Sequence, residues 1–240
     1  MSDTEDLEPI PNIGEYSGDR NEYGARHGEG KNTFPNQDLY VGHYENGMRN
    51  GLGTYTWAFT GESYSGEYKN GARNGSGTLK YVNSTTFDGS FQEGRRHGNG
   101  TMTFPNGDTY TGAWNLGYPH GKGEYKYASC DATLQGEWEW GRIETGAMVH
   151  ADGSKWVGGF RMNQPFGEGK YVVGYWTQEG EIVEPSPPEV EEEEPEEEEE
   201  EEDAEKKEPT IEDQIPKREP LRLMDTVFRP KGGLVYSMPK

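Results

Sequence analysis

The sequence predicts an all-β protein: an elongated single-layer antiparallel sheet of about seven stacked hairpins, followed by a disordered acidic tail. Three observations predict this class. Glycine is very abundant, with 35 of 240 residues, and 33 of these glycines lie within residues 13–180. Aromatic residues make up 12% of the chain, although only 30% of it is hydrophobic. A short motif also recurs at a nearly constant interval, which is typical of a repeat protein.

The recurring motif is an aromatic residue, then any residue, then glycine. It begins at seven positions that are 22–24 residues apart: Tyr16, Tyr40, Tyr64, Phe87, Tyr110, the degenerate Leu134, and Trp156. A second aromatic residue follows four positions later in most units, and a Gly-x-Gly pair comes after it. The regularity predicts one structural unit repeated along residues 13–180.

The stretch 104–127 indicates how one unit folds. Side chains of a strand alternate between its two faces, so rings and glycines fall on one face and small or polar residues on the other. The segment 115–120 contains Gly117 and Pro119, which favour a turn. A hairpin around this turn would pair Trp114 with Gly121, Gly112 with Gly123, and Tyr110 with Tyr125. Rings would then cover bare glycines, which compensates for the weakness of glycine in a sheet.

The face that carries the rings is the main candidate for function. A single layer cannot cover both of its faces, and a long exposed aromatic stripe marks a partner site. We therefore predict partner binding by six residues: Tyr40, Tyr64, Tyr110, Trp114, Trp138 and Trp156. The alternative is that the rings only stack on one another and hold the sheet together. The two open edges offer a second place where an extended peptide could add.

The sixth unit departs from the pattern. Leu134 replaces the first ring, and Thr145 and Ala147 stand where the glycine pair is expected. One interpretation is a local bend or a docking point for a neighbouring subunit. The other is drift at a tolerant position.

The net charge of −21 is concentrated in one tract. Residues 181–208 hold 17 acidic residues against two lysines, and such a composition predicts disorder. The tract either keeps the protein soluble or repels and guides an opposing charged surface. Residues 1–12 form a short acidic segment. Because the body at 13–180 is near neutral, we expect no nucleic-acid or membrane partner.

The last segment, 209–240, is too apolar for a simple spacer. We predict that it docks, through Leu223, Phe228 and Tyr236, either on a partner or back on the sheet. The chain also lacks a recognisable signal peptide and any apolar run long enough for a membrane helix. A soluble, intracellular protein is therefore expected.

The residues predict no catalysis, no cofactor and no metal. His27, His97 and His120 recur in equivalent turns, and adjacent units would lie too far apart for two of them to share an ion. The Gly-x-Gly pairs lead into strand-like sequence, whereas a phosphate loop leads into a helix. Cys130, the single cysteine, has no basic neighbour to activate its thiol.

The pattern YxGxWxxGxxHGxGxY resembles the MORN repeat. Residues 13–30, the unit after them, the degenerate sixth unit and residues 160–172 more closely resemble the MORN-repeat subunits of the axonemal radial spoke head. The extra residue between Tyr16 and Gly28 and the acidic tail strengthen this likeness.

The resemblance implies a structural subunit that scaffolds the spoke head and relays mechanical signals between the central pair and the dynein arms. Its partners would be other spoke-head subunits, a second copy or a sibling repeat protein, and central-pair projections. It would lie in the axoneme of a cilium or flagellum, and in the cytoplasm before assembly. Two alternatives remain: a MORN scaffold that binds membrane phosphoinositides, and a regulator fused to an enzyme domain, for which residues 181–240 leave little room.

Overall fold

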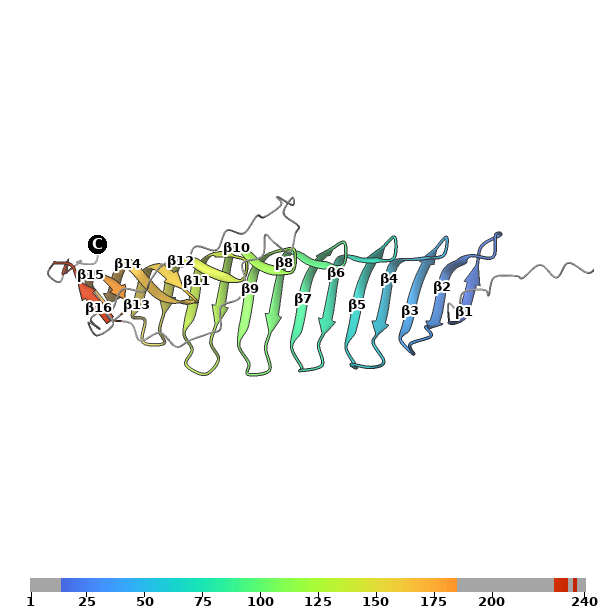
Figure 1. Cartoon of the computed structure of the whole chain (residues 1–240), viewed down its shortest axis with the longest axis horizontal. Coiled ribbons are helices and arrows are strands. Elements are labelled where there is room, and N and C mark those ends of the chain that lie inside the picture. The colour runs from blue at the N-terminus through green and yellow to red at the C-terminus, as the bar shows by residue number, and fades with distance from the viewer. Residues whose placement is uncertain (1–13, 185–226, 233–234, 237–240) are drawn as a thin grey trace, which may run out of the picture. The chain divides into compact units, whose positions relative to one another are not determined.

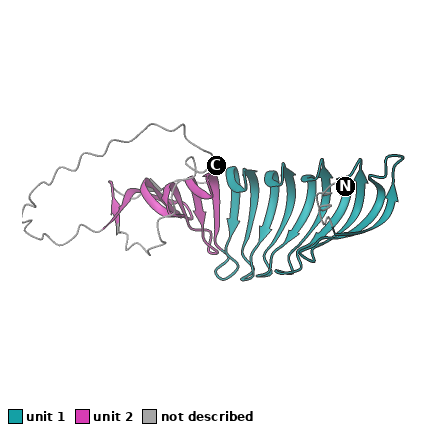
Figure 2. Ribbon diagram, turned by 45° about the vertical axis from the view of Figure 1, so that its right-hand side comes forward, with its two compact units in different colours: residues 1–131 teal, residues 132–240 magenta. Residues whose placement is uncertain are grey.

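The computed structural model describes residues 14–184, 227–232 and 235–236 (Figure 1). These residues fall into two compact units, 1–131 and 132–240, which Figure 2 colours separately. Every regular element among the described residues is a β-strand, and neighbouring strands pair antiparallel. The predicted all-β class and the stack of antiparallel hairpins are therefore confirmed.

The first unit contains ten strands that pair in sequence order, so that five hairpins follow one another along the sheet (Figure 1). Its strands are β1 (Glu15–Arg20), β2 (Arg26–Thr33), β3 (Leu39–Glu45), β4 (Met48–Thr56), β5 (Ser63–Lys69), β6 (Ala72–Lys80), β7 (Thr86–Gln92), β8 (Arg95–Thr103), β9 (Thr109–Asn115) and β10 (Tyr118–Lys126).

The second unit has the same plan, with two further hairpins and three additional strands. Its strands are β11 (Thr133–Glu139), β12 (Arg142–Val149), β13 (Lys155–Arg161), β14 (Gln164–Val173), β15 (Trp176–Val183), β16 (Val227–Pro230) and β17 (Val235–Tyr236). Strand β15 continues three residues into the range 181–208, for which the sequence predicts disorder. Residues 185–208 and residues 1–13 lie outside the described residues.

Two-residue turns close the hairpins after the first. In β3–β4 the turn is Asn46–Gly47, and both residues have positive φ angles, 48° and 87°. The same pair of positive angles recurs at Asn70–Gly71 and at Leu116–Gly117. Turns of this kind match the right-handed twist of the flanking strands and fix their register. A leucine in this conformation at 116 is a position that sequence preference alone would not choose.

Each hairpin contains a bulge. Because of the bulge, one of the predicted pairings is wrong. Gly112 pairs with Gly123 and Tyr110 with Tyr125, as the sequence predicts, but Trp114 pairs with Pro119 instead of Gly121. The register shifts because β10 has more residues than β9 between these pairs. A bulge of this kind bends a strand and re-aims its side chains. Trp114 does face a glycine, Gly98, on its other side in β8.

A row of paired glycines crosses the sheet in each unit. We call it the glycine row; in the first unit it consists of Gly18, Gly30, Gly42, Gly53, Gly66, Gly77, Gly89, Gly100, Gly112 and Gly123. In the second unit it consists of Gly136, Gly146, Gly158, Gly169 and Gly180. At Gly53 an added Cβ would lie 2.2 Å from the hydroxyl of Tyr40. The row therefore makes space for the rings.

Candidate interaction site

The six residues predicted to form an aromatic stripe are buried. The exposed fraction is 0% for Tyr40, Tyr64 and Trp156, and no more than 3% for Tyr110, Trp114 and Trp138. An exposed stripe is therefore the wrong description of these side chains, because other rings and the glycine row cover them. Their role in partner binding stays a prediction, and any direct contact would require the surrounding side chains to move.

Nine rings of the first unit form a continuous series, which we call the ring ladder. Its members, in order of contact, are Tyr16, Tyr44, Tyr40, Tyr68, Tyr64, Phe91, Phe87, Trp114 and Tyr110. Successive ring centres are 5.0–5.4 Å apart and their planes cross at 76–89°. This edge-to-face geometry is the favoured arrangement of aromatic pairs. The ladder thus joins each hairpin of this unit to the next.

The hydroxyl group of the tyrosine that begins a repeat bonds to the bulge of the same hairpin. The Tyr40 hydroxyl donates to the carbonyl of His43 at 3.0 Å, and the Tyr64 hydroxyl donates to the carbonyl of Glu67 at the same distance. Tyr110 repeats the bond with the carbonyl of Ala113. Burial raises the pKa of the Tyr110 hydroxyl well above its ordinary value. These hydroxyls therefore stay protonated at neutral pH and act as hydrogen-bond donors.

Among the arginines that lie over the ring ladder, four form a regular series that the sequence-based prediction missed. Arg26, Arg49, Arg73 and Arg96 occupy equivalent positions in successive hairpins and lie 4.6–5.7 Å above ladder rings. The signal was present in the sequence, since these arginines recur every 23 or 24 residues. Cation–π contacts of this kind stabilise by about 0.5–2 kcal/mol, depending on desolvation.

Three of these arginines also tie one hairpin to the next. The Nη2 atom of Arg49 donates to the carbonyl of Gly71 at 2.6 Å, and Arg73 bonds in the same way to Gly94 at 2.7 Å. Arg96 continues the series with Gly117 at 2.6 Å. Burial lowers the pKa of the Arg96 guanidinium, although it remains charged at neutral pH. A cavity of about 290 Å³, lined by Arg49, Arg73, Tyr55, Trp57 and Tyr68, lies between two members of the series.

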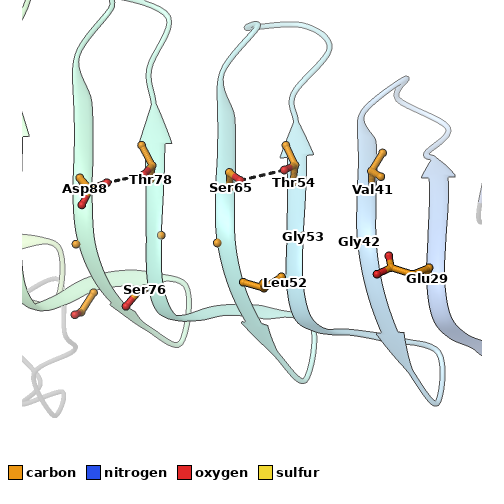
Figure 3. Close-up of a pocket in the computed structure, with 14 residues that line it drawn as sticks. Glu29, Val41, Gly42, Leu52, Gly53, Thr54, Ser65, Ser76, Thr78 and Asp88 are labelled. Carbon is orange, nitrogen blue, oxygen red and sulfur yellow. Dashed lines mark hydrogen bonds between the residues drawn. The ribbon is translucent and has the colours of Figure 1, made fainter.

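The opposite face of the first unit carries small polar side chains, and we call it the hydroxyl face. A groove of about 620 Å³ runs over it from β2 to β7. Thr54 donates to Ser65 at 3.1 Å, and Thr78 donates to Asp88 at 2.6 Å (Figure 3). These two hydrogen bonds join side chains on neighbouring strands. Val41 and Leu52 are the aliphatic side chains in the lining of the groove.

The remaining residues that the sequence singles out are the histidines, the Gly-x-Gly pairs and Cys130. Within the described ranges, no group of three or more His, Cys, Asp or Glu side chains is placed to hold a metal ion. His27 and His97 lie in β2 and β8, and the Gly-x-Gly pairs are part of strands. Cys130 is exposed. No helix in the described part of the chain is long and apolar enough to cross a membrane.

The irregular sixth hairpin is shorter by one residue than the regular hairpins. The predicted alignment of Thr145 and Ala147 with the glycine pair is therefore wrong. Gly136 of β11 pairs with Gly146, so the glycine row is intact here. Thr145 and Ala147 therefore do not stand at glycine positions; they flank the glycine and line a shallow groove of about 600 Å³ with Val157. Leu134 is buried at 1% exposure in place of a ring. A docking role for these three residues stays a prediction.

The C-terminal segment meets the sheet. Phe228 lies in β16, which pairs with β15 in the register Ile182 to Phe228. Tyr236 lies in β17, where its backbone pairs with that of Trp176. Leu223 lies outside the described residues. The sequence predicts that 209–240 docks either on a partner or back on the sheet. Residues 227–230 fold back on the sheet.

Known proteins share both the repeat and parts of the sequence. Short segments match the radial spoke head 1 homolog of Cyprinus carpio, with 62% identity over 34 residues, and that of Mus musculus, with 61% over 33 residues. Each match covers 14% of this chain, and 16% and 11% of the two relatives respectively. The matched segment therefore spans less than a fifth of either relative.

Among solved structures, the SAS-4 TCP domain of Drosophila melanogaster, in complex with a proline-rich motif of Ana2, aligns over 70% of this chain and 90% of its own. The identity is 14% and the TM-score is 0.41. The MORN repeat family model matches residues 22–39, 40–58, 64–86, 87–109, 110–129 and 156–172, which together make up half of the chain. These segments pass over the short sixth hairpin and coincide with the regular ones, and the chain accordingly belongs to the MORN-repeat family.

Proposed function

We propose that this protein is a non-catalytic structural subunit of the axonemal radial spoke head. The observation that carries the proposal is the identity of about three residues in five with radial spoke head 1 homologs over a 34-residue segment. Membership of the MORN-repeat family agrees with a scaffolding role. In this role the protein scaffolds spoke-head assembly and relays mechanical signals between the central pair and the dynein arms.

The contacts between hairpins support a role in transmitting force. Each hairpin of the first unit is joined to the next by a backbone ladder and by ring contacts, and from β4 to β9 also by an arginine bond to a turn carbonyl. Because repeat proteins depend on nearest-neighbour interfaces, such a series passes a displacement from one hairpin to the next. The buried carboxylate of Asp108 accepts hydrogen bonds from Tyr125 and Ala128, which gives it a structural role.

The proposed partners are other spoke-head subunits, with a second copy or a sibling MORN protein among them, and the central-pair projections that face the spoke head. The proposed location is the axoneme, with a cytoplasmic pool before assembly. The test is to tag the protein in a ciliated cell and to extract the membrane with detergent. We expect the tag to stay with the axoneme and to be lost in cells that lack radial spokes. Retention in axonemes without spokes would contradict the proposal.

Binding to membrane phosphoinositides is the competing function. The arginines of the ring ladder are engaged with rings and carbonyls, which leaves them poorly placed to meet lipid headgroups. We expect the purified protein to stay at the bottom of the gradient in flotation with vesicles that contain phosphatidylinositol bisphosphate. Flotation that is abolished by Arg49→Gln and Arg73→Gln would favour the lipid-binding alternative.

A further inference from the structure

Strand β15 has the pattern of a MORN strand but lacks its ring. Gly180 continues the glycine row by pairing with Gly169, and Ile182, two residues later, is buried at 4% exposure. In β13 the residue two positions before the row glycine is Trp156, whose ring covers Gly169. The equivalent residue of β15 is Gln178. The strand therefore leaves the glycine at 180 without a ring from its own sequence.

Phe228 of β16 supplies the missing ring. A Cβ added at Gly180 would lie 2.3 Å from this ring, as one added at Gly169 would lie 2.4 Å from Trp156. The Phe228 ring also meets Tyr171 edge to face at 5.0 Å, and Trp156 at 6.3 Å. A residue far away in sequence thus occupies the place that the first ring of a repeat takes elsewhere.

Polar contacts hold the rest of this segment. Lys231 places its Nζ atom 2.6 Å from Glu168 and 3.7 Å from Glu181. Its backbone N–H donates to the carbonyl of Glu179 at 2.8 Å, and the Gln178 side chain donates to the carbonyl of Gly232 at 2.9 Å. Pro230 sits opposite Gly180, where the outer strand tolerates a residue without an N–H. Arg229 is exposed.

These contacts define what the site recognises: an extended backbone, an aromatic ring, a proline two positions later and a lysine directly after it. We propose that the β15 edge is a docking site for an extended peptide of this pattern in a partner protein, and that residues 227–231 are its tethered, displaceable occupant. The inference rests on the geometry around Gly180 and is independent of the proposed place in the spoke head.

Displacement is feasible because the resident strand is short. Among the described residues, four of β16 and two of β17 pair with β15, and residues 185–226 connect them to it in sequence. Joining an occupant to its site in one chain gives it an effective concentration that is typically on the order of 1 mM. If a free peptide binds the vacant site with a dissociation constant of about 100 μM, the resident segment weakens its apparent affinity roughly tenfold. A partner held nearby in an assembly overcomes a factor of this size.

The test uses the full-length chain and a labelled peptide with the sequence of residues 225–234. We expect fluorescence anisotropy to show binding to the Phe228→Ala chain, and binding at least about tenfold weaker to the unchanged chain, because only the variant loses its own ring. A peptide with the Phe228→Ala substitution should not bind. A peptide with Lys231→Glu should bind poorly to Phe228→Ala and regain affinity for a Phe228→Ala chain that also carries Glu168→Lys.

Three results would overturn the inference: no binding to the Phe228→Ala chain, equal binding to the variant and the unchanged chain, or equal binding of the peptides with lysine and glutamate at 231. A second full-length variant, Lys231→Glu, guards against misfolding of the first, since its exposed charge can change without loss of a ring. It should bind the unchanged peptide more tightly than the parent chain does. If the Lys231→Glu chain binds the peptide no more tightly than the parent chain, the proposal that residues 227–231 compete for the site is also contradicted.

Discussion

The Tyr55 hydroxyl donates a 2.5 Å hydrogen bond to the carboxylate of Asp38, and the same pair recurs three hairpins later as Tyr125 and Asp108, at 2.7 Å. Each carboxylate also accepts a bond from a backbone N–H twenty residues further on, that of Ala58 or Ala128. Both aspartates are 5% exposed. They therefore fasten the loop of one hairpin to the loop of the next.

Asp108→Ala should destabilise the first unit by about 1–2 kcal/mol, because it leaves the half-buried Tyr125 hydroxyl and the Ala128 N–H without their acceptor. The midpoint of urea unfolding, followed by tryptophan fluorescence, measures the loss. The matched control is Asp88→Ala, which removes an exposed carboxylate bonded to Thr78 and should cost no more than about 0.5 kcal/mol. Equal losses for the two variants would show that the interlock adds no stability.

The same aspartates predict a loss of stability in acid. Burial raises the pKa of Asp38 and Asp108, but bonds from tyrosine, backbone and asparagine outweigh it, so both values fall below the usual 3.8. Because the folded-state pKa is depressed, this contribution is complete above the unfolded-state pKa and disappears as pH falls through the folded-state pKa. The stability difference from the Asp38→Asn, Asp108→Asn variant should shrink below about pH 4. Urea midpoints between pH 6 and pH 2.5 measure it, and a constant difference would contradict the prediction.

Gly53→Ala should be far more costly than an ordinary glycine substitution. The new Cβ would lie 2.2–2.6 Å from the Tyr40 ring, which is fully buried and cannot move aside. We expect a loss of about 2–3 kcal/mol from overpacking. Gly61→Ala is the control, since its φ of 74° is strained but its surroundings are open, and it should cost about 1 kcal/mol. Combining Gly53→Ala with Tyr40→Ala should restore part of the loss in a double-mutant cycle.

Adjacent arginines in β8 provide a test of the arginine series. Arg96→Met should destabilise by about 1–2 kcal/mol, because the bond to the Gly117 carbonyl and the contact with Trp114 are lost. Arg96→Lys should recover little, since an ammonium group cannot stack on the ring and reach the carbonyl as a planar guanidinium does. The exposed neighbour is the control, and Arg95→Met should change the urea midpoint only slightly. Indistinguishable midpoints for Arg96→Met and Arg95→Met would contradict this reading.

Inserting one glycine between Glu144 and Thr145 should give the sixth hairpin the length of its neighbours, because the usual bulge has one more residue. The fold should tolerate the insertion, as circular dichroism can establish. If the irregularity is a docking point, incorporation of the tagged protein into spoke heads should fall. Normal incorporation would favour the alternative of neutral drift.

The sequence predicts the hairpins well because rings and glycines alternate with a strict period. The prediction correctly pairs Gly112 with Gly123, and it correctly has the Tyr110 ring cover glycine. It fails at Trp114, since a bulge changes register without leaving a periodic signal. It also misjudges exposure: alternation tells which face a ring takes, but not that arginines and neighbouring rings will cover that face. The sequence names Phe228 as a docking residue and includes folding back on the sheet as an alternative, but it does not predict that the ring covers Gly180, because a contact across such a distance in sequence leaves no local pattern.

The contacts of the first unit follow a rule with consequences for how such a chain can change length. The bonds that join hairpins run from one repeat to the next, as from Arg49 to Gly71 and from Tyr64 to Phe91. Duplication or loss of a whole segment of 23 or 24 residues recreates the same junction, because every donor again meets its acceptor. A gain of half a segment would place rings opposite bulges. Gene lineages that carry this architecture should therefore differ by whole repeats.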